Sequence, residues 1–202
     1  MYLKDEVINT ITIEKSQFIC YCKHIQTEIE YKEYLNNIKK KHYDASHVCS
    51  GLILDNIKRS NDDGEPSGTA GAPILNVLEK NNLNQMCAIV VRYFGGIKLG
   101  AGGLIRAYSN AVSQAIQRGI LVEDKTYLKF SLTLTYEMAN KIEHYLGNNT
   151  ILIDTNYDTD ITYTFALDNL KKMETIKEYT KGIEATQIGD ITIQSMVKWI
   201  YA

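Results

Sequence analysis

The pattern of hydrophobic and polar residues predicts alternating strands and helices in the first half of the chain. Residues 7–22 carry apolar side chains among polar ones, as in extended structure. A helix near 27–42 should follow, because Tyr31, Leu35 and Ile38 fall at i, i+4 and i+7 and form one apolar stripe. Two apolar runs then predict strands, the second of them central in a sheet, at 48–54 and 86–91.

The clearest helix of the chain begins near residue 104. Its apolar residues recur on one face of a 3.6-residue period, and they are Leu104, Ala107, Tyr108, Ala111, Val112, Ala115 and Ile116. Gly119 is placed to end this helix. A shorter helix is predicted to run to about Lys80, with Ser67 or Thr69 as its N-cap and Pro73 in its first turn.

The pattern changes after residues 123–125, so we predict two domains, 1–124 and 125–202. The second domain should contain a strand, a helix, two strands, a helix and a long final strand, at 128–134, 138–146, 150–156, 160–167, 170–179 and within 183–199. The order βαββαβ predicts a four-stranded antiparallel sheet with two helices on one face. Taken together, the chain should have an α+β fold.

Composition and charge exclude several classes of protein. The 202 residues have a formal net charge of −2, which argues against a polybasic nucleic-acid or membrane binder but allows a local basic patch. No apolar run approaches the roughly 20 residues of a membrane span, and the N-terminus does not resemble a signal peptide. We therefore predict a cytoplasmic protein with no membrane partner. Four cysteines match no zinc-binding spacing and should be buried and reduced: Cys20, Cys22, Cys49 and Cys87.

Glycine is concentrated in two segments, 62–73 and 92–108. Eight of the 13 glycines and both prolines lie between Gly64 and Gly103. The second segment opens into the predicted helix, where backbone N–H groups and the helix dipole favour a bound anion. We therefore predict that this segment binds an anion or nucleic acid through Arg92, Tyr93, Gly95, Gly96, Lys98, Gly100, Gly102, Gly103 and Arg106.

A structural role is the alternative for the same segment. Its glycines could form a tight turn that packs the helix against the sheet, and Tyr93 and Phe94 could pack at a strand end instead of stacking on a base. The segment lacks the Gly-Lys-Ser/Thr of a P-loop and the last glycine of a dinucleotide-binding fingerprint. We therefore predict no cofactor.

Three interpretations are open for the acidic residues of the first segment. Asp62, Asp63 and Glu65 could bind Mg²⁺ or supply a general base. They could instead make local contacts, with Glu65 paired to Arg92 or Arg106, or form a solvated acidic loop. Among the specific interpretations we favour the pair with Arg92. It would join both glycine segments into one hollow lined by amides and guanidinium groups.

The residue types that support catalysis are weakly represented. His47 begins a predicted strand, and a lone histidine is expected to be structural. Ser67 lacks a Gly-x-Ser-x-Gly elbow, and Cys49 has no evident histidine partner. Ser67 and Thr69 are expected either to donate hydroxyl groups to the same cleft or to cap a helix. We therefore predict no catalytic residue and no bound metal.

The glycine segments closely resemble the IMPACT/YigZ family. Its marks are D-D-G-E-P-x-G-T-A-G-x-P-I-L, matched at 62–75, and V-x-R-Y-F-G-G-I-K-L-G-x-G-G-L-x-R-A-Y, matched at 90–108. The resemblance implies a first domain with the left-handed βαβ fold of a ribosomal protein and a ferredoxin-like second domain, similar to domains IV and V of elongation factor G. It also implies a link to translation, because the eukaryotic relatives regulate translation by binding an activator of an initiation-factor kinase.

Three functions follow as hypotheses. The first is a translation-associated binding module that contacts RNA, the ribosome or a translation factor through the glycine-rich face. The second is a metal-assisted hydrolase or phosphate-handling enzyme in which Asp62, Asp63 and Glu65 hold the cation and His47 is an acid or base. The third is a module that binds a translation-related protein only.

Overall fold

The computed structural model describes residues 1–197, which separate into two compact units. Residues 1–123, together with Met196 and Val197, belong to the first unit, and residues 124–195 form the second. The protein has the predicted α+β character, with five helices and two sheets among the described residues. The handedness and the likeness to elongation-factor domains stay predictions.

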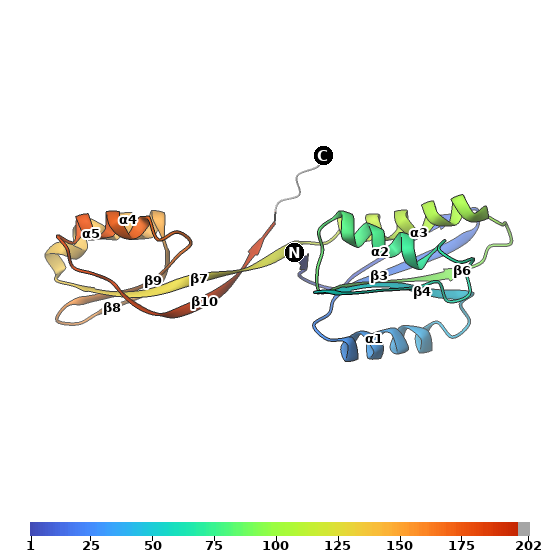
Figure 1. Cartoon of the computed structure of the whole chain (residues 1–202), viewed down its shortest axis with the longest axis horizontal. Coiled ribbons are helices and arrows are strands. Elements are labelled where there is room, and N and C mark those ends of the chain that lie inside the picture. Colours follow the sequence, from blue (N-terminus) through green and yellow to red (C-terminus); the bar gives the residue numbers. More distant parts are fainter. Residues whose placement is uncertain (198–202) are drawn as a thin grey trace. The chain divides into compact units, whose positions relative to one another are not determined.

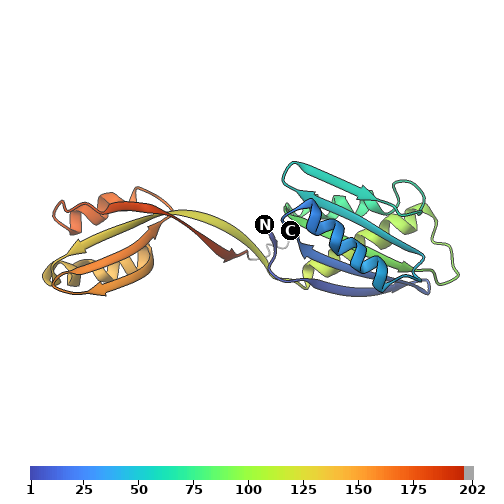
Figure 2. The same cartoon turned by 90° about the horizontal axis from the view of Figure 1, so that it is seen from below.

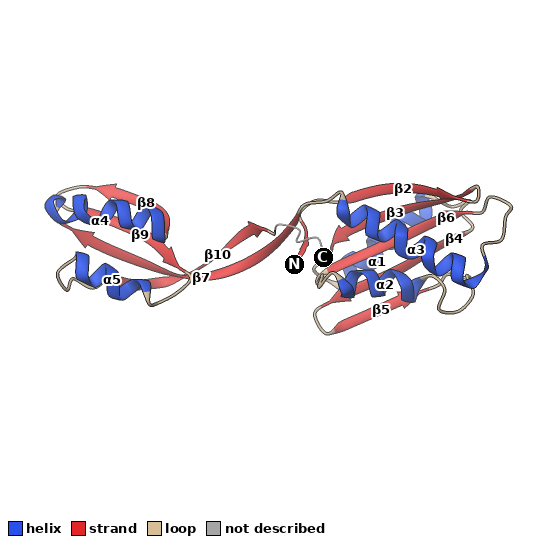
Figure 3. Cartoon of the chain, turned by 90° about the horizontal axis from the view of Figure 1, so that it is seen from above, coloured by secondary structure: helices blue, strands red, loops and turns tan. Residues whose placement is uncertain are grey.

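The first unit contains a five-stranded antiparallel sheet between two layers of helices. Its strand order is β2-β3-β6-β4-β5. Helix α1 lies on one face of this sheet (Figures 1 and 2), and helices α2 and α3 lie side by side on the other (Figure 3). The elements are β1 (Tyr2–Leu3), β2 (Val7–Ile13), β3 (Ser16–His24), α1 (Glu28–Lys41), β4 (His47–Leu54), β5 (Ile57–Asn61), α2 (Gly71–Lys80), β6 (Met86–Tyr93) and α3 (Gly100–Gln117).

Strand β6 is the centre of the first unit, as its continuous apolar run predicts. Ala88 and Val90 face the core beneath α2 and α3, whereas Ile89 and Val91 face the core beneath α1. Successive side chains of a strand point to opposite faces, so a strand covered on both sides must be apolar throughout. The extended stretch 7–22 is two paired strands, β2 and β3.

The predicted apolar face of α3 is confirmed, because all seven of its residues are buried. The helix ends at Gln117, close to Gly119. A Cβ atom at Gly119 would lie 2.2 Å from Leu3 Cδ2, so this glycine is needed where the chain packs closely against β1. All four cysteines are buried free thiols, as expected.

The second unit contains the predicted sheet with α4 and α5 on one face (Figure 1). The strand order is β1-β7-β9-β8 with β10 also paired with β7, where β1 pairs only with residues 121 and 122 at the start of β7, and the core includes Phe130, Leu132, Ile142 and Phe165. The predicted elements are all present with shifted ends, and residues 198 and 199 of the predicted final strand lie outside the described residues. The elements are β7 (Leu121–Leu134), α4 (Tyr136–Asn149), β8 (Ile151–Tyr157), β9 (Ile161–Leu167), α5 (Lys172–Tyr179) and β10 (Thr186–Met196).

Candidate anion-binding pocket

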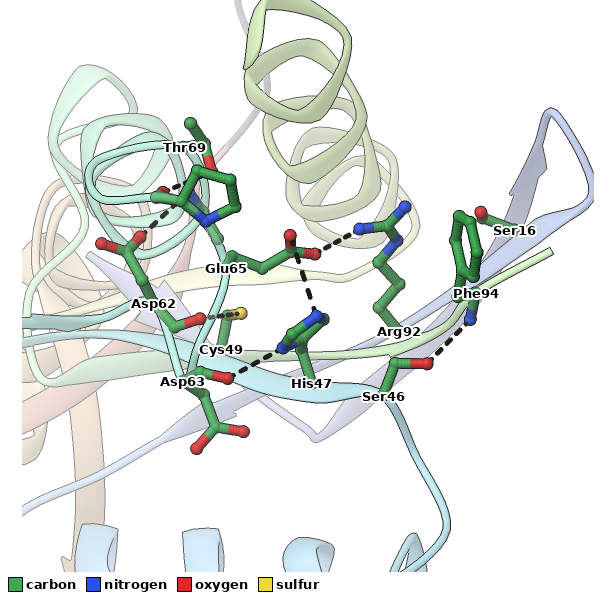
Figure 4. A network of polar contacts seen from close by, with 12 residues as sticks. Ser16, Ser46, His47, Cys49, Asp62, Asp63, Glu65, Thr69, Arg92 and Phe94 are labelled. Carbon is green, nitrogen blue, oxygen red and sulfur yellow. Dashed lines mark hydrogen bonds and ion pairs between the residues drawn. The ribbon is translucent and has the colours of Figure 1, made fainter. Parts of the chain in front are cut away.

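A buried ion pair joins the two glycine segments. Arg92 Nη1, at the end of β6, donates to Glu65 Oε1 at 2.5 Å (Figure 4). The two side chains are only 6% and 3% exposed. This contact confirms the pairing of Glu65 with Arg92 that the sequence favoured, and it fixes the loop before α2 against the central strand.

Glu65 lies at the centre of a wider network of polar contacts beneath α2 and α3. The hydroxyl of Tyr108, on α3, donates to Glu65 Oε1 at 2.8 Å, and His47 Nε2 lies 3.9 Å from Glu65 Oε2. His47 Nδ1 lies 2.9 Å from the carbonyl oxygen of Asp63. A carbonyl oxygen only accepts, so Nδ1 carries a hydrogen and His47 is held in one orientation. The position of His47 therefore suits the structural role expected for it.

Cys49 belongs to the same network but is not activated as a nucleophile. Its thiol lies 3.0 Å from the carbonyl oxygen of Asp62 and 3.4 Å from the Tyr108 hydroxyl. Burial raises the pKa of Cys49 to about 12, and burial likewise raises that of Tyr108. Both groups therefore stay protonated at neutral pH, and the thiolate that nucleophilic chemistry requires is not formed.

Asp62 caps α2, which corrects the predicted cap. Its carboxylate accepts from the backbone N–H groups of Gly68, Ala70 and Gly71 at 2.8, 3.0 and 2.8 Å. The N-cap residue is Ala70, and no side chain of its own caps the helix. The predicted caps were wrong, because the Thr69 hydroxyl donates to the carbonyl of Pro66 and Ser67 is exposed.

The carboxylates of the first segment have separate protein partners and do not converge. Asp63 accepts from Lys39 Nζ and from the Val48 N–H, each at 2.7 Å, on the side of the loop away from Glu65 (Figure 4). Within residues 1–197, no group of three or more His, Cys, Asp or Glu residues is arranged to hold a metal ion. The geometry therefore gives no support to the Mg²⁺ interpretation.

A cavity of about 500 Å³ lies where the two glycine segments meet. We call it the α3 pocket, because the first turn of α3 forms one wall. The other walls are the start of β4, the loop before α2 and the end of β6. Its lining residues are Ser46, His47, Glu65, Pro66, Arg92, Phe94, Lys98, Leu99, Gly100, Ala101 and Leu104.

Arg92 lies in this pocket with its guanidinium group between two aromatic rings, and one of its nitrogens lacks a hydrogen bond. The centre of its guanidinium group is 5.5 Å from the centre of the Phe18 ring and 5.4 Å from that of the Phe94 ring. Nη1 bonds to Glu65, whereas Nε is buried and has no hydrogen-bond partner among the described residues. Nε is itself inaccessible, so its missing hydrogen bond does not face the pocket, and the Tyr163 hydroxyl and the Asn9 amide are unpaired in the same way.

The first turn of α3 adds backbone donors to the same pocket. Its N-cap residue, Leu99, makes no side-chain capping hydrogen bond, whereas Thr27 caps α1 and Asp62 caps α2. Gly100 has φ +69° and open space where a side chain would be. Uncapped N–H groups at a helix start carry partial positive charge and favour an anion.

The structure does not bring all the predicted site residues together. Arg106 is exposed and lines a separate cavity of about 940 Å³, which shares Lys98 and Leu99 with the α3 pocket. The prediction that one hollow is lined by both guanidinium groups is therefore wrong. The reason is helical geometry, because Arg106 lies on the exposed side of α3, whereas Leu104 and Tyr108 on its buried face reach the α3 pocket and Glu65.

Tyr93 is also placed away from the pocket. Its hydroxyl lies 2.9 Å from His42 Nδ1 and donates to Asp44 at 3.2 Å, on the α1 face of the sheet. Adjacent residues of a strand point to opposite faces, so the alternation along β6 already predicts that Tyr93 and Arg92 lie on opposite faces of the sheet. Phe94, which follows the strand, is the aromatic residue that reaches the pocket, and it is 49% exposed.

The glycines divide into structural and open positions. A Cβ atom at Gly95 would lie 2.0 Å from the backbone carbon of Lys15, and the Gly95 N–H donates to Ser16 Oγ, so Gly95 packs the turn closely against β3. At Gly103 a Cβ atom would lie 2.9 Å from Leu99 Cβ. No such contact limits the open positions, which are Gly96, Gly100 and Gly102.

Three residues of the site were not predicted from the sequence. Phe18 and Ser46 come from distant segments and lack a local motif, so nothing in the sequence identified them. Tyr108 lies on the predicted core face of α3, and a tyrosine hydroxyl in a core needs a polar partner. The need of a buried tyrosine hydroxyl for a polar partner could therefore have indicated a buried carboxylate near Tyr108.

Comparison with known proteins identifies the family to which this chain belongs. The Impact N-terminal domain matches residues 14–116, which include both glycine segments. The IMPACT family member YvyE of Bacillus subtilis is 41% identical over 197 residues, covering 94% of this chain and 91% of that protein. An IMPACT family member of Haemophilus influenzae is 42% identical over 200 residues, covering 95% and 94%.

Two further proteins are similar to this chain over most of its length. YigZ of Escherichia coli is 35% identical over 169 residues, covering 80% of this chain and 82% of that protein. A crystal structure of a hypothetical protein is similar with a TM-score of 0.58 and 29% identity, covering 93% of this chain and 96% of the other. The chain therefore belongs to the IMPACT family. Among the described residues, no helix is both long and apolar enough to span a membrane.

Proposed function

We propose that this protein is a translation-associated module that binds RNA through phosphate groups held in the α3 pocket. The resemblance to the IMPACT/YigZ family, whose eukaryotic members regulate translation, supports the association with translation. The pocket supports phosphate as the recognised group, because it combines a guanidinium group, an ammonium group and the N-terminus of a helix of 18 residues. A translation-related protein is the alternative partner if RNA does not bind.

The observation that carries this proposal is that Arg92, Lys98 and the first turn of α3, whose N-cap makes no side-chain capping hydrogen bond, line one pocket. Glu65 balances the charge of Arg92, so Arg92 alone would leave the pocket neutral. Lys98 and the α3 dipole then make the pocket electropositive. This local field suits a protein whose net charge is −2, because only one site need attract a phosphate.

The three carboxylates of the loop before α2 do not favour the hydrolase alternative. Asp62 is engaged by backbone N–H groups, Asp63 by Lys39 and Glu65 by Arg92. Recruiting them to a cation would uncap α2 and leave buried charge unpaired, which costs several kcal/mol. We therefore do not assign metal-assisted hydrolysis to this loop.

The first prediction concerns single-stranded RNA and Lys98. Lys98→Ala should weaken binding of an RNA oligonucleotide and reduce the magnitude of its salt slope by about 0.7, the contribution of one lost phosphate contact. Fluorescence anisotropy over a range of salt concentrations measures both quantities. Lys32→Ala removes an equal charge from the exposed side of α1, on the opposite face of the sheet, and should leave binding unchanged. Equal affinities and slopes for the wild type and Lys98→Ala would contradict the proposal.

A further inference from the structure

We infer that the α3 pocket recognises the phosphorylated end of an RNA chain, rather than a phosphodiester within it. This inference rests on the proposed function and narrows its ligand to a phosphomonoester on a nucleotide. It starts from the enclosure of Arg92, whose side chain lines the pocket and is only 6% exposed.

The depth at which Arg92 lies favours a ligand with a free end, because its side chain is almost inaccessible whereas Lys98 and Phe94 in the same pocket are exposed. The walls of the pocket come from the start of β4, the loop before α2, the end of β6 and the first turn of α3. An internal phosphodiester carries the chain on both sides, so it needs a way in and a way out. A terminal phosphate carries the chain on one side only. The volume of about 500 Å³ lies within the range of sites for small ligands, so one nucleotide is a suitable occupant.

The donors in the pocket suit the charge and oxygen count of a monoester. A phosphomonoester carries about −1.5 to −2 charge at neutral pH and has three terminal oxygens, compared with a single charge on a diester. Lys98 and the uncapped N–H groups at the start of α3 supply donors from one side. Ser46 supplies another, because its oxygen accepts from the Phe94 N–H at 3.0 Å and its own hydrogen remains to be donated.

Phe94 provides a place for the base beside the phosphate. One face of its ring lies against the Arg92 guanidinium, yet the side chain remains 49% exposed. A base stacked on the outer face would extend the Phe18–Arg92–Phe94 stack by one ring. Stacking on an aromatic side chain tolerates any base, so the site should read the phosphorylated end and not the sequence.

The test compares three RNA oligonucleotides of one sequence, which carry a 5′-phosphate, a 3′-phosphate or hydroxyl groups at both ends. We expect one phosphorylated form to bind at least about ten-fold more tightly than the hydroxyl form, and a nucleoside monophosphate to compete with it. The better of the two phosphorylated forms identifies the end that is recognised. Equal binding of all three would overturn the inference and leave the proposed function standing. Absence of binding by all three at low salt would overturn both.

A variant with an internal anion makes the test specific to the pocket. Ala101 is exposed in the first turn of α3 and lines the pocket, so Ala101→Asp places a carboxylate where the phosphate should lie. A carboxylate suits a helix start, so this variant should fold. We expect it to abolish the preference for the phosphorylated end, and Ala101→Asn, of equal size without the charge, to weaken it less. Asn36→Asp on α1 adds the same charge elsewhere and should have no effect.

The base contact has its own matched pair. Phe94→Ala should weaken binding of the phosphorylated oligonucleotide by at least about five-fold, as loss of one stacked base implies. Tyr43→Ala removes another exposed aromatic ring, beyond the end of α1, and serves as the control. A preference for the phosphorylated end that survives unchanged in Ala101→Asp would place the recognition outside this pocket and overturn the inference.

Discussion

Glu65 shows how a single buried charge can organise a site. Its carboxylate is nearly inaccessible, and one oxygen accepts from both Arg92 and Tyr108. Burying a carboxylate is tolerable only when hydrogen bonds and an opposite charge replace its water. Removing either partner therefore leaves the buried carboxylate without compensation for its lost water, so even a small substitution at Arg92 or Tyr108 should lower the free energy of unfolding.

Tyr108→Phe should lower the free energy of unfolding by about 2 kcal/mol, because it removes a buried hydrogen bond to a charged group. Tyr163→Phe is the matched control, since the Tyr163 hydroxyl is buried with no partner among the described residues. That second change should be neutral or slightly stabilising. Urea unfolding followed by circular dichroism compares the two, and a larger loss for Tyr163→Phe would contradict this account.

At the scale of elements, α2 depends on a carboxylate eight residues before its N-cap. Asp62 replaces the missing cap of Ala70 and at the same time closes the loop that carries Glu65. One side chain thus fixes both the start of a helix and one wall of the α3 pocket. In the first unit, α3 is the helix whose start is left without a side-chain cap, so its first turn has donors for a ligand.

Asp62→Ala should lower the free energy of unfolding by about 2 kcal/mol, at the top of the range for a lost cap, because three N–H groups lose their acceptor. Thr27→Ala removes a cap with one such bond, to the Glu30 N–H, and should cost about 1 kcal/mol. Thermal unfolding of both variants measures the difference. A smaller loss for Asp62→Ala than for Thr27→Ala would show that the carboxylate is not the effective cap.

At the scale of the whole molecule, the two units respond differently to acid. Burial alone would raise the pKa of Asp62 and of Asp63. For Asp62, hydrogen bonds from backbone N–H groups outweigh burial, so its pKa is lowered. For Asp63, the hydrogen bonds from Lys39 and from the Val48 N–H outweigh burial, so its pKa is lowered as well. In the second unit, the pKa of Asp168 is lowered by Lys172 and that of Glu184 by Lys177, but both carboxyls lie at the surface. Ion pairs in water contribute little to stability.

The first unit should therefore lose more stability than the second between about pH 5 and pH 2. A carboxyl whose pKa is lowered by folding contributes stability above its unfolded pKa of about 3.9, and this contribution disappears as the pH falls through the folded value. Thermal unfolding followed by NMR at several pH values resolves the two units by residue. A larger fall in the unfolding temperature of residues 124–195 than of residues 1–123 over this pH range would contradict the prediction.

The sequence by itself determined the elements and one essential contact. The buried face of α3, the central position of β6 and the order of elements in the second unit follow from periodicity, which depends on neighbours a few residues apart. The pair Glu65 and Arg92 was also favoured from the sequence, because it would join both glycine segments, although Arg106 was an alternative partner.

Only the tertiary structure decided which side chains share the α3 pocket. Asp62 became the cap of α2 in place of Ser67 or Thr69, and Arg106 was separated from Arg92. Phe18 and Ser46 joined the site from remote segments. Such choices depend on which strands are neighbours in the sheet and on the direction in which each helix face points. Both are set by long-range packing, which leaves no local pattern in the sequence.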